Sequence, residues 1–264
     1  MPPALEIIAG RAVAPGATFT ALTVNTGNSF TIRDAREGSE ILLLQIWDDV
    51  QGAGTLRVRS PRFHDNVQGI RLDTVVGDLS PALPWGLPEP MLRQDPLTVE
   101  IIGSATAGDV EAVGMLVYYQ DLPGSDAELA SWEQIAPRIR HIVTVENTIA
   151  SGTTGDWSGE EAINAEFDLL KANTPYALLG YIVDTEAASI RWRGADTGNY
   201  GVGGPGEPAL RFLTKDWFVM LSQAYGLPLI PVFNSGNRAG ILIDCHQDEN
   251  GADPTVTSIF AELG

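Results

Sequence analysis

The most constraining feature of this 264-residue sequence is a repetition of short segments at about half its length. Leu56-Arg57-Val58-Arg59 returns as Ile190-Arg191-Trp192-Arg193, 134 residues later. Leu43-Leu44-Gln45-Ile46-Trp47 returns, more loosely, as Leu178-Leu179-Gly180-Tyr181-Ile182, 135 residues later. A repeat of this size is that of an ordinary domain, and solenoid units are much shorter, about 20–50 residues. We therefore predict two similar domains in tandem.

Later segments extend the repeat. Trp85 matches Trp217 and Pro96-Leu97 matches Pro228-Leu229, both at an offset of 132, and Gly114-Met115-Leu116-Val117 resembles Gly240-Ile241-Leu242-Ile243 at an offset of 126. The order of the matches is the same in both halves. They predict a first domain over residues 1–124, a connector helix over 125–137 and a second domain over 138–264.

The pattern within each half is that of strands. Leu56 and Val58 alternate with Arg57 and Arg59, so one face of that strand is apolar and the other is charged. Short strands separated by Gly and Pro turns favour an all-β sandwich or barrel over a parallel α/β sheet. The other strands predicted in the first half are 18–32, folded around a turn at 25–28, then 40–50, 97–102 and 113–119.

Helical signals are few. Ser125 and Glu128 have the spacing of a capping box, and Pro137 would end that helix. A second helix is predicted over 158–170, with Ile163, Phe167 and Leu170 on one face. A third is predicted over 215–225, capped by Thr214, with Trp217, Met220, Leu221 and Ala224 buried and Gly226 past its end, and a shorter counterpart over 88–93.

Composition excludes several classes of protein. Cys245 is the single cysteine, which rules out a disulfide scaffold. No run of about 18 apolar residues is present, and the first residues lack the pattern of a signal peptide, so we expect neither a membrane span nor secretion by that route. The formal net charge is −18, which opposes binding to a phosphate backbone. Adaptation to high salt and an arginine-preferring genome both remain open as origins of the acidity.

No motif predicts a catalytic, cofactor-binding or metal site. His64, His141 and His246 are far apart in sequence, whereas a two-domain cupin enzyme needs clustered histidines, and neighbours such as Cys245 and His246 on a strand point to opposite faces. Residues 201–206 read Gly-x-Gly-x-x-Gly, but without the strand and helix of a nucleotide site, so we interpret them as a flexible loop. Residues 248–253 lack the closing Glu of a calcium loop, which leaves only an adventitious surface Ca²⁺ open.

On the repeated Leu/Ile-Arg-Val/Trp-Arg strands, the paired Trp85 and Trp217, and the paired Pro-Leu segments, the whole chain resembles the double jelly-roll major capsid proteins of membrane-containing double-stranded DNA viruses and phages. The resemblance implies two tandem jelly-roll β-sandwiches and a homotrimer of pseudo-hexagonal outline that builds an icosahedral shell. It also implies a non-enzymatic protein of the virion, made in the host cytoplasm. Its partners would be copies of itself and other virion proteins, such as penton or membrane-associated proteins, without direct contact to nucleic acid.

Two alternatives stay open from the sequence. The first is a phage spike or decoration protein, or a pair of carbohydrate-binding sandwiches, in which loop aromatics such as Trp157 and Tyr200 would stack on sugars. The second is a bicupin-like enzyme that has lost or relocated its site. The histidine count argues against the second.

Overall fold

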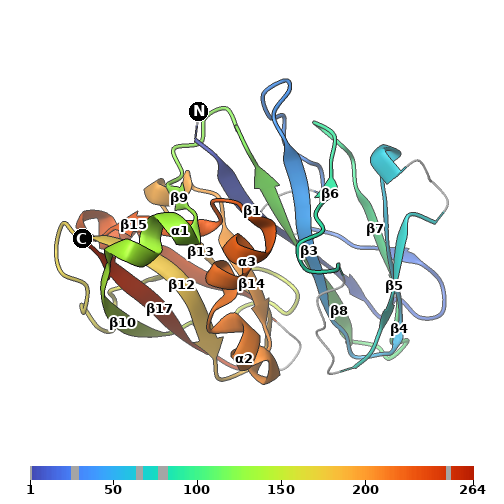
Figure 1. Cartoon of the computed structure of the whole chain (residues 1–264). Helices are drawn as coiled ribbons and strands as arrows, with labels where there is room; N and C mark the ends of the chain where they lie inside the picture. Colours follow the sequence, from blue (N-terminus) through green and yellow to red (C-terminus); the bar gives the residue numbers. More distant parts are fainter. Residues whose placement is uncertain (1, 25–29, 64–67, 77–82, 248–250) are drawn as a thin grey trace.

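The chain folds into two β-sandwiches that lie side by side (Figure 1). The computed structural model describes residues 2–24, 30–63, 68–76, 83–247 and 251–264. Nearly all of its regular structure is β-strand, arranged in four antiparallel sheets, and the helices are short. The predicted fold class, all-β with two tandem jelly-roll sandwiches, is confirmed. Within the described ranges, no helix combines the length and the apolar character needed to span a membrane.

The first sandwich consists of two four-stranded sheets, ordered β1-β8-β3-β6 and β2-β7-β4-β5. The strands run over β1 Ala4–Val13, β2 Thr20–Ala21, β3 Ile41–Asp49, β4 Gly54–Arg59, β5 Ile70–Thr74, β6 Glu89–Pro90, β7 Thr98–Ile102 and β8 Val110–Tyr119. A 3-10 turn, η1, covers Pro61–Phe63.

The second sandwich has a five-stranded sheet, β10-β17-β12-β15-β9, and a four-stranded sheet, β11-β16-β13-β14. Its strands are β9 Leu129–Ala130, β10 Ile139–Thr148, β11 Glu161–Ala162, β12 Pro175–Val183, β13 Ala187–Arg193, β14 Val202–Gly206, β15 Ile230–Asn234, β16 Leu242–His246 and β17 Thr255–Leu263. The helices are α1 Trp132–Ile135, α2 Arg211–Thr214 and α3 Trp217–Tyr225, with 3-10 turns η2 Ala136–Arg138, η3 Ala195–Thr197, η4 Pro208–Leu210 and η5 Ser235–Gly240.

The strand order is the same in both sandwiches. When β9, an additional edge strand, is left out of the count, the first, eighth, third and sixth strands of each sandwich form one sheet, and the second, seventh, fourth and fifth form the other. This is the eight-stranded order of a jelly roll. The third strands also share a register irregularity, between Leu43 and Gln45 in β3 and between Leu178 and Gly180 in β12. The match of residues 56–59 with 190–193 and that of residues 43–47 with 178–182 therefore join equivalent strands of the two sandwiches. The domain boundaries at residues 124 and 138 stay a prediction.

Two of the other matches are wrong as equivalences. Residues 114–117 lie in the eighth strand of the first sandwich, whereas residues 240–243 lead into β16, the seventh strand of the second. Pro96-Leu97 precedes a seventh strand, β7, and Pro228-Leu229 precedes a sixth, β15. Short apolar runs recur in every strand of a sandwich, so similarity of letters alone does not fix which strand is matched.

Of the predicted helices, the third forms nearly as expected. α3 ends at Gly226, whose φ of 66° is the left-handed conformation that favours glycine. Its N-cap is Asp216, because Thr214 belongs to the preceding helix α2. Trp217 and Leu221 are buried as expected, but Ala224 is exposed.

The connector helix is much shorter than predicted. In residues 125–137 only α1 is α-helical, and the 3-10 turn η2 follows it. The Gln134 side chain closes the first turn of α1 by accepting a hydrogen bond from the N–H of Ser131 at 2.8 Å. The segment before it forms β9, which pairs with β15 at the edge of the second sandwich. The predicted helix over 88–93 is also wrong, because β6 pairs there with β3.

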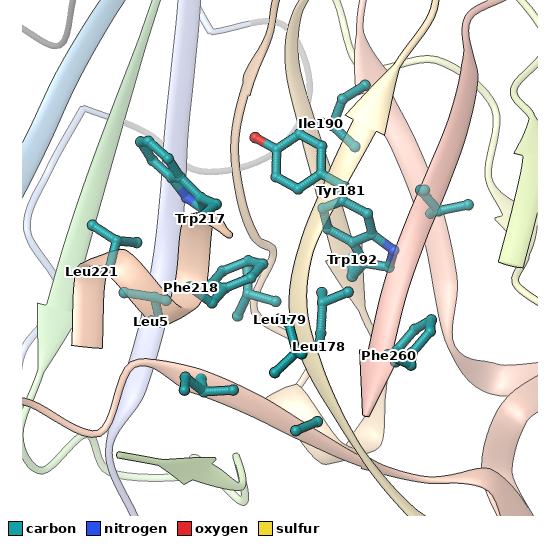
Figure 2. Close-up of a cluster of buried hydrophobic side chains, with 14 of the residues drawn as sticks. Leu5, Leu178, Leu179, Tyr181, Ile190, Trp192, Trp217, Phe218, Leu221 and Phe260 are labelled. Atoms are coloured by element: carbon teal, nitrogen blue, oxygen red, sulfur yellow. The ribbon is translucent and has the colours of Figure 1, made fainter. Parts of the chain in front are cut away.

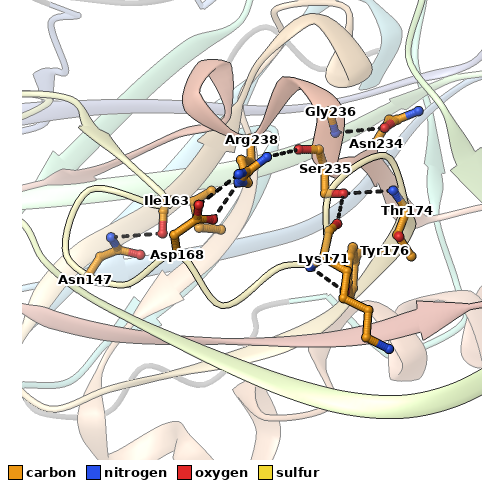
Figure 3. A network of polar contacts seen from close by, with 10 residues as sticks. All are labelled: Asn147, Ile163, Asp168, Lys171, Thr174, Tyr176, Asn234, Ser235, Gly236 and Arg238. Atoms are coloured by element: carbon orange, nitrogen blue, oxygen red, sulfur yellow. Dashed lines mark hydrogen bonds and ion pairs between the residues drawn. The ribbon is translucent and has the colours of Figure 1, made fainter.

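The predicted helix over 158–170 is absent from the described residues, which contain the short strand β11 and a loop instead (Figure 3). That loop is bonded to distant parts of the chain. Arg238 Nη2 donates to Asp168 Oδ2 at 2.8 Å, and Asn147 Nδ2 donates to the carbonyl of Ile163 at 3.4 Å. Tertiary hydrogen bonds thus override the helical spacing of the apolar residues.

The turn predicted at 25–28 lies outside the described residues. The segments that flank it do not pair with each other where they are described. Thr20 and Ala21 pair with β7, and Thr31 forms a bridge with Pro96. The predicted hairpin over 18–32 is therefore wrong for the described part of that range.

One sheet of the first sandwich is buried on both faces. Every residue of β3 and of β8 is buried. Ile46 and Met115 face the core of the first sandwich, whereas Leu5 of β1 joins the aromatic core of the second, near Phe218 and Leu221 (Figure 2). The sheet β1-β8-β3-β6 thus packs with one face on the other sheet of the first sandwich, β2-β7-β4-β5, and with its other face on the second sandwich.

Candidate interaction surface

The outer face of the sheet β2-β7-β4-β5 carries a cluster of two arginines and one carboxylate. Arg57 of β4 lies directly across from Glu100 of β7. Its Nε is 2.7 Å from Glu100 Oε2, and Arg59 Nε is 2.8 Å from the same oxygen. Burial by itself would raise the pKa of Glu100, but the hydrogen bonds and charges of both arginines outweigh it and lower that pKa.

The second sandwich contains the same cluster on the equivalent strands. Arg191 of β13 lies across from Asp244 of β16 and binds it through two hydrogen bonds, Nε to Oδ1 at 2.8 Å and Nη2 to Oδ2 at 2.7 Å. Arg193 Nη2 approaches the same carboxylate at 3.7 Å. Two parallel hydrogen bonds between a guanidinium and a carboxylate fix geometry as well as charge.

An aromatic ring covers the first arginine of each cluster. The ring of Phe19, which directly precedes β2, lies 3.7 Å from Cζ of Arg57. The ring of Trp157, in the segment before β11, lies 3.8 Å from Cζ of Arg191. Both are cation–π contacts at short range. The fourth and seventh strands and the approach to the second strand therefore carry one arrangement twice.

The two clusters differ in what covers them. Arg191 and Asp244 expose 8% and 1% of their side chains, whereas their counterparts Arg57 and Glu100 expose 20% and 11%. The outer arginines Arg193 and Arg59 are both partly exposed. The difference arises because the first sandwich packs on the face of the second that carries Arg191. The equivalent face of the first sandwich is the outer side of β4, β5 and β7. It lies on the side of the molecule away from the second sandwich, which therefore does not cover it (Figure 1).

The contact between the sandwiches is specific. Trp47 of β3 donates its indole N–H to the carbonyl of Ala188 at 3.1 Å and to Ser189 Oγ at 3.0 Å. The N–H of Ile7 in β1 donates to the carbonyl of Gly201 at 2.8 Å, and Arg11 donates to the carbonyl of Thr154. The outer side of β1-β8-β3-β6 in the first sandwich thus packs on the outer side of β11-β16-β13-β14 in the second, so the two faces in contact are not equivalent ones.

His246 is fully buried next to the second cluster. Its ring meets Trp157 edge to face, with centroids 5.4 Å apart. Burial lowers the pKa of His246 to about 4, with the charges of Arg191 and Arg11 acting in the same direction and that of Asp156 against it. The folded protein therefore holds a neutral imidazole at neutral pH.

We expect acid to destabilise the protein through His246. Between the ordinary pKa of 6.5 and about 4, the unfolded chain binds a proton on this ring and the folded chain does not. The contribution of His246 to the free energy of unfolding is therefore fully present above pH 6.5. It decreases as the pH is lowered through the interval, by up to about 1.4 kcal/mol per pH unit. Urea unfolding of the wild type and of His246→Gln at several pH values measures the difference. Equal slopes in the two proteins over this interval would contradict the assignment.

The residues singled out in the sequence are scattered. His64 and residues 248–250 lie outside the described residues, and His141 is exposed on β10. Cys245 is buried, with its sulfur 3.0 Å from Ser158 Oγ. In the part of the chain that the structure describes, no three His, Cys, Asp or Glu side chains gather as metal ligands would.

The prediction that the glycine-rich residues 201–206 form a flexible loop is wrong. Residues 202–206 form β14, a buried strand. A Cβ on Gly203 would lie 1.9 Å from the carbonyl oxygen of Ile190, and one on Gly204 would lie 2.7 Å from the ring of Trp217. The glycines permit close packing inside the second sandwich.

The two aromatics suggested for sugar stacking, Trp157 and Tyr200, are mostly buried and only partly exposed. Arg191 lies over the ring of Trp157, and Arg33 lies over the ring of Tyr200 with its Cζ 4.8 Å from the centroid. Sequence reasoning did not identify Phe19, Glu100 or Asp244. The signal that leads to them is the repeated Arg-x-Arg strand, whose outward arginines need carboxylate partners on the neighbouring strand.

Comparisons with known proteins give structural likenesses only. No family model matches the sequence, and no curated protein matches it. Among solved structures, the chain is similar to the PBSX exported protein XepA, with 8% identity and a TM-score of 0.22 over 97% of this chain and 86% of that one. It is also similar to the major capsid protein P2 of bacteriophage PM2, with 8% identity and a TM-score of 0.27 over 99% and 98%. It is similar as well to the STIV MCP, with 9% identity and a TM-score of 0.23 over 99% of this chain and 96% of that one. Because these TM-scores are low, the strand order and contacts of this chain are the basis for inferring its function.

Proposed function

We propose that the protein is a viral or phage major coat protein that assembles as homotrimers into an icosahedral shell. The observation that carries the proposal is the pairing of two jelly rolls in one chain through unlike faces. The outer side of β1-β8-β3-β6 packs on the outer side of β11-β16-β13-β14. Jelly rolls of eight strands are a fold of capsid proteins, lectins and cupins.

A contact between unlike faces is suited to building rings. Such head-to-tail contacts close into a ring when the rotation between units permits it. Three chains contribute six jelly rolls, and a ring of six has a pseudo-hexagonal outline that tiles a surface. Its partners are then copies of itself and, in a shell, other virion proteins such as penton or membrane-associated proteins.

The proposed role is structural and not enzymatic. Packing in a shell depends on buried area and shape, and it needs no reacting group. A net charge of −18 is compatible with a coat that does not bind the genome directly. The protein would be made in the host cytoplasm and located in the virion.

We expect the purified protein to form a trimer of 28.2 kDa chains. Light scattering after size exclusion measures the mass, and negative-stain electron microscopy should show pseudo-hexagonal particles. A protein that stays monomeric at high concentration contradicts the proposal. A monomer that binds glycans on an array would instead favour the alternative of a carbohydrate-binding, spike or decoration protein.

A further inference from the structure

The outer edge of β10 is a strand edge without a partner in the described part of the chain. β10 spans ten residues, lies at the end of the sheet β10-β17-β12-β15-β9 and is paired there with β17 alone. A strand at the end of a sheet presents unpaired N–H and C=O groups to its surroundings. We propose that this edge pairs antiparallel with the same edge of a second copy, across a twofold axis, so that the sheets of the two copies join.

Two hydrogen bonds at the end of β10 show which backbone groups point outward. The N–H of Thr148 donates to Glu166 Oε1 at 2.7 Å, which is on the side away from β17. The N–H of the next residue, Ile149, donates to the carbonyl of Pro254, just before β17, at 2.9 Å. Successive residues of this strand therefore direct their N–H groups to opposite sides.

This alternation identifies the open donors of the edge. Beyond a bulge near residue 140, the register of β10 with β17 is unbroken up to Thr148. Counting back from Thr148 in steps of two, the N–H groups that point outward are those of Ile142, Thr144 and Glu146. None of the three donates a hydrogen bond to another described residue.

The equivalent edge of the first sandwich is occupied. In β1, the N–H of Ile7 donates to the carbonyl of Gly201 at 2.8 Å, and the N–H of Arg11 donates to the carbonyl of Thr23 at 2.9 Å. Ile7 and Thr144 are equivalent, because each lies in the row that follows the irregularity in the third strand. The same outward N–H thus has an acceptor in one sandwich and, among the described residues, none in the other.

The open stretch of β10 is accessible to a partner. Ile142 is 56% exposed, and Thr144 and Glu146 are exposed as well. The helices α2 and α3 pack on β12, and β17 separates that strand from β10. β10 lies at the border of the second sandwich, on the side away from the first (Figure 1).

The residues of β10 favour a second copy of the same strand as the partner. In an antiparallel pair centred on Val143, Ile142 of each copy lies opposite Thr144 of the other, and both residues have their N–H groups outward. The same pairing brings Arg140 of each copy level with Glu146 of the other. Opposite charges across a strand pair stabilise it, and like charges destabilise it. The strand that this edge requires, with its acid and its base in reverse order, is therefore β10 itself.

The contact uses the same patch on both copies, as twofold contacts do. It is separate from the threefold contact of the proposed trimer and does not rest on it. In a shell it would join one trimer to the next. A single strand pair is a small contact beside the about 1,200–2,000 Å² that stable interfaces bury, so we expect pairing to increase with protein concentration.

Charge reversals test the partner and the orientation. Glu146→Arg places two bases at each end of the pair, and Arg140→Glu places two acids there, so each variant alone should fail to pair. Mixed one to one, the two variants should pair with each other, because each end then combines a base with an acid. Glu37→Arg is the matched control, since it makes the same change of charge at an exposed position in the first sandwich.

A proline tests the backbone contact. Thr144→Pro removes an outward N–H and leaves the ladder with β17 intact, a position at which an edge strand tolerates proline. It should abolish pairing, whereas Thr144→Ala, which keeps the N–H, should not. Circular dichroism and thermal melting confirm that each variant is folded.

Sedimentation velocity over a series of concentrations and amide hydrogen exchange of residues 139–148 measure the pairing. We expect the wild type to form species larger than three chains, with the outward amides protected only in those species. Larger species that persist in the blocked variants, or their absence from the wild type at high concentration, overturn the pairing. Protection at every concentration would mean that the chain covers its own edge, and it overturns the pairing too. A wild type that forms pairs of chains but no trimers overturns the coat trimer and leaves the pairing standing.

Discussion

Asp244→Asn is expected to lower the free energy of unfolding by about 3–5 kcal/mol, because it leaves the guanidinium of Arg191 buried without its counter-charge. Asp244 exposes 1% of its side chain and makes both hydrogen bonds of the pair. The substitution keeps the shape of the side chain, so the loss reports on charge and hydrogen bonding. Urea unfolding at neutral pH measures it.

The twin cluster supplies the matched control. Glu100→Gln removes the same charge from the equivalent place, but Arg57 and Arg59 are partly exposed and keep contact with water. We expect a cost of about 1 kcal/mol, as for solvent-accessible ion pairs. Equal losses for the two variants would contradict the view that the first sandwich buries the Arg191–Asp244 pair.

A second variant separates charge from packing at Asp244. Adding Arg191→Met to Asp244→Asn removes the uncompensated guanidinium and leaves an apolar side chain under Trp157. The double variant should recover part of the stability lost by Asp244→Asn alone, because a buried ion pair can often be replaced by apolar groups at little cost. No recovery would mean that the loss comes from distortion of β16 and not from the buried charge.

The fold class could be predicted because its signals are local. The alternation of Leu56 and Val58 with arginines, and the recurrence of that strand half a chain later, both survive in β4 and β13. The order of the strands could not be predicted from the same letters. Segments such as 114–117 and 240–243 look alike yet occupy different strands, because pairing is decided by register and topology across long distances in sequence.

The arginine–carboxylate clusters show where sequence reasoning stops. Arg57 and Arg191 are visible in the repeat, but Glu100 and Asp244 stand among 34 acids and nothing local distinguishes them. Their role depends on the pairing of the fourth strand with the seventh in each sandwich. Phe19 is hidden for the same reason, since the second strand reaches the fourth only through the seventh.

The failed helix over 158–170 has a different cause. Ile163 and Leu170 are buried as an amphipathic helix would require, but Phe167, on the same predicted face, is 51% exposed. Asp168 of the segment accepts a hydrogen bond from Arg238, and just after the segment Thr174 N–H donates to Ser235 Oγ at 2.9 Å (Figure 3). Helical spacing is a weak preference when the tertiary structure offers the backbone other partners.

Trp47→Ala is expected to cost about 3–5 kcal/mol, the range for removing a buried tryptophan from a core. Trp47 exposes 1% of its surface and lies across the contact between the sandwiches. Its ring meets Trp217 edge to face, with centroids 6.2 Å apart, and packs on Gly114, where a Cβ would lie 2.3 Å from the ring. The cavity cannot be filled from β8 because glycine has no side chain to move.

The same variant should weaken the coupling between the sandwiches. Trp47 links β3 to β13 through its bonds to Ala188 and Ser189, so its loss removes side-chain packing and a buried donor together. Calorimetry of the wild type should show one cooperative transition, whereas Trp47→Ala should broaden it or split it in two. Trp47→Phe keeps an aromatic ring but removes the N–H donor, so its free energy of unfolding should lie between those of the wild type and Trp47→Ala.

Trp85→Ala is the control for these measurements. Trp85 also meets Trp217, with centroids 5.7 Å apart, but it is only half buried and makes its contact at the rim of the same region. We expect a loss of about 1–2 kcal/mol without division of the transition, because less apolar area leaves contact with protein. If Trp85→Ala split the transition and Trp47→Ala did not, the rim and not the face containing Trp47 would couple the two sandwiches.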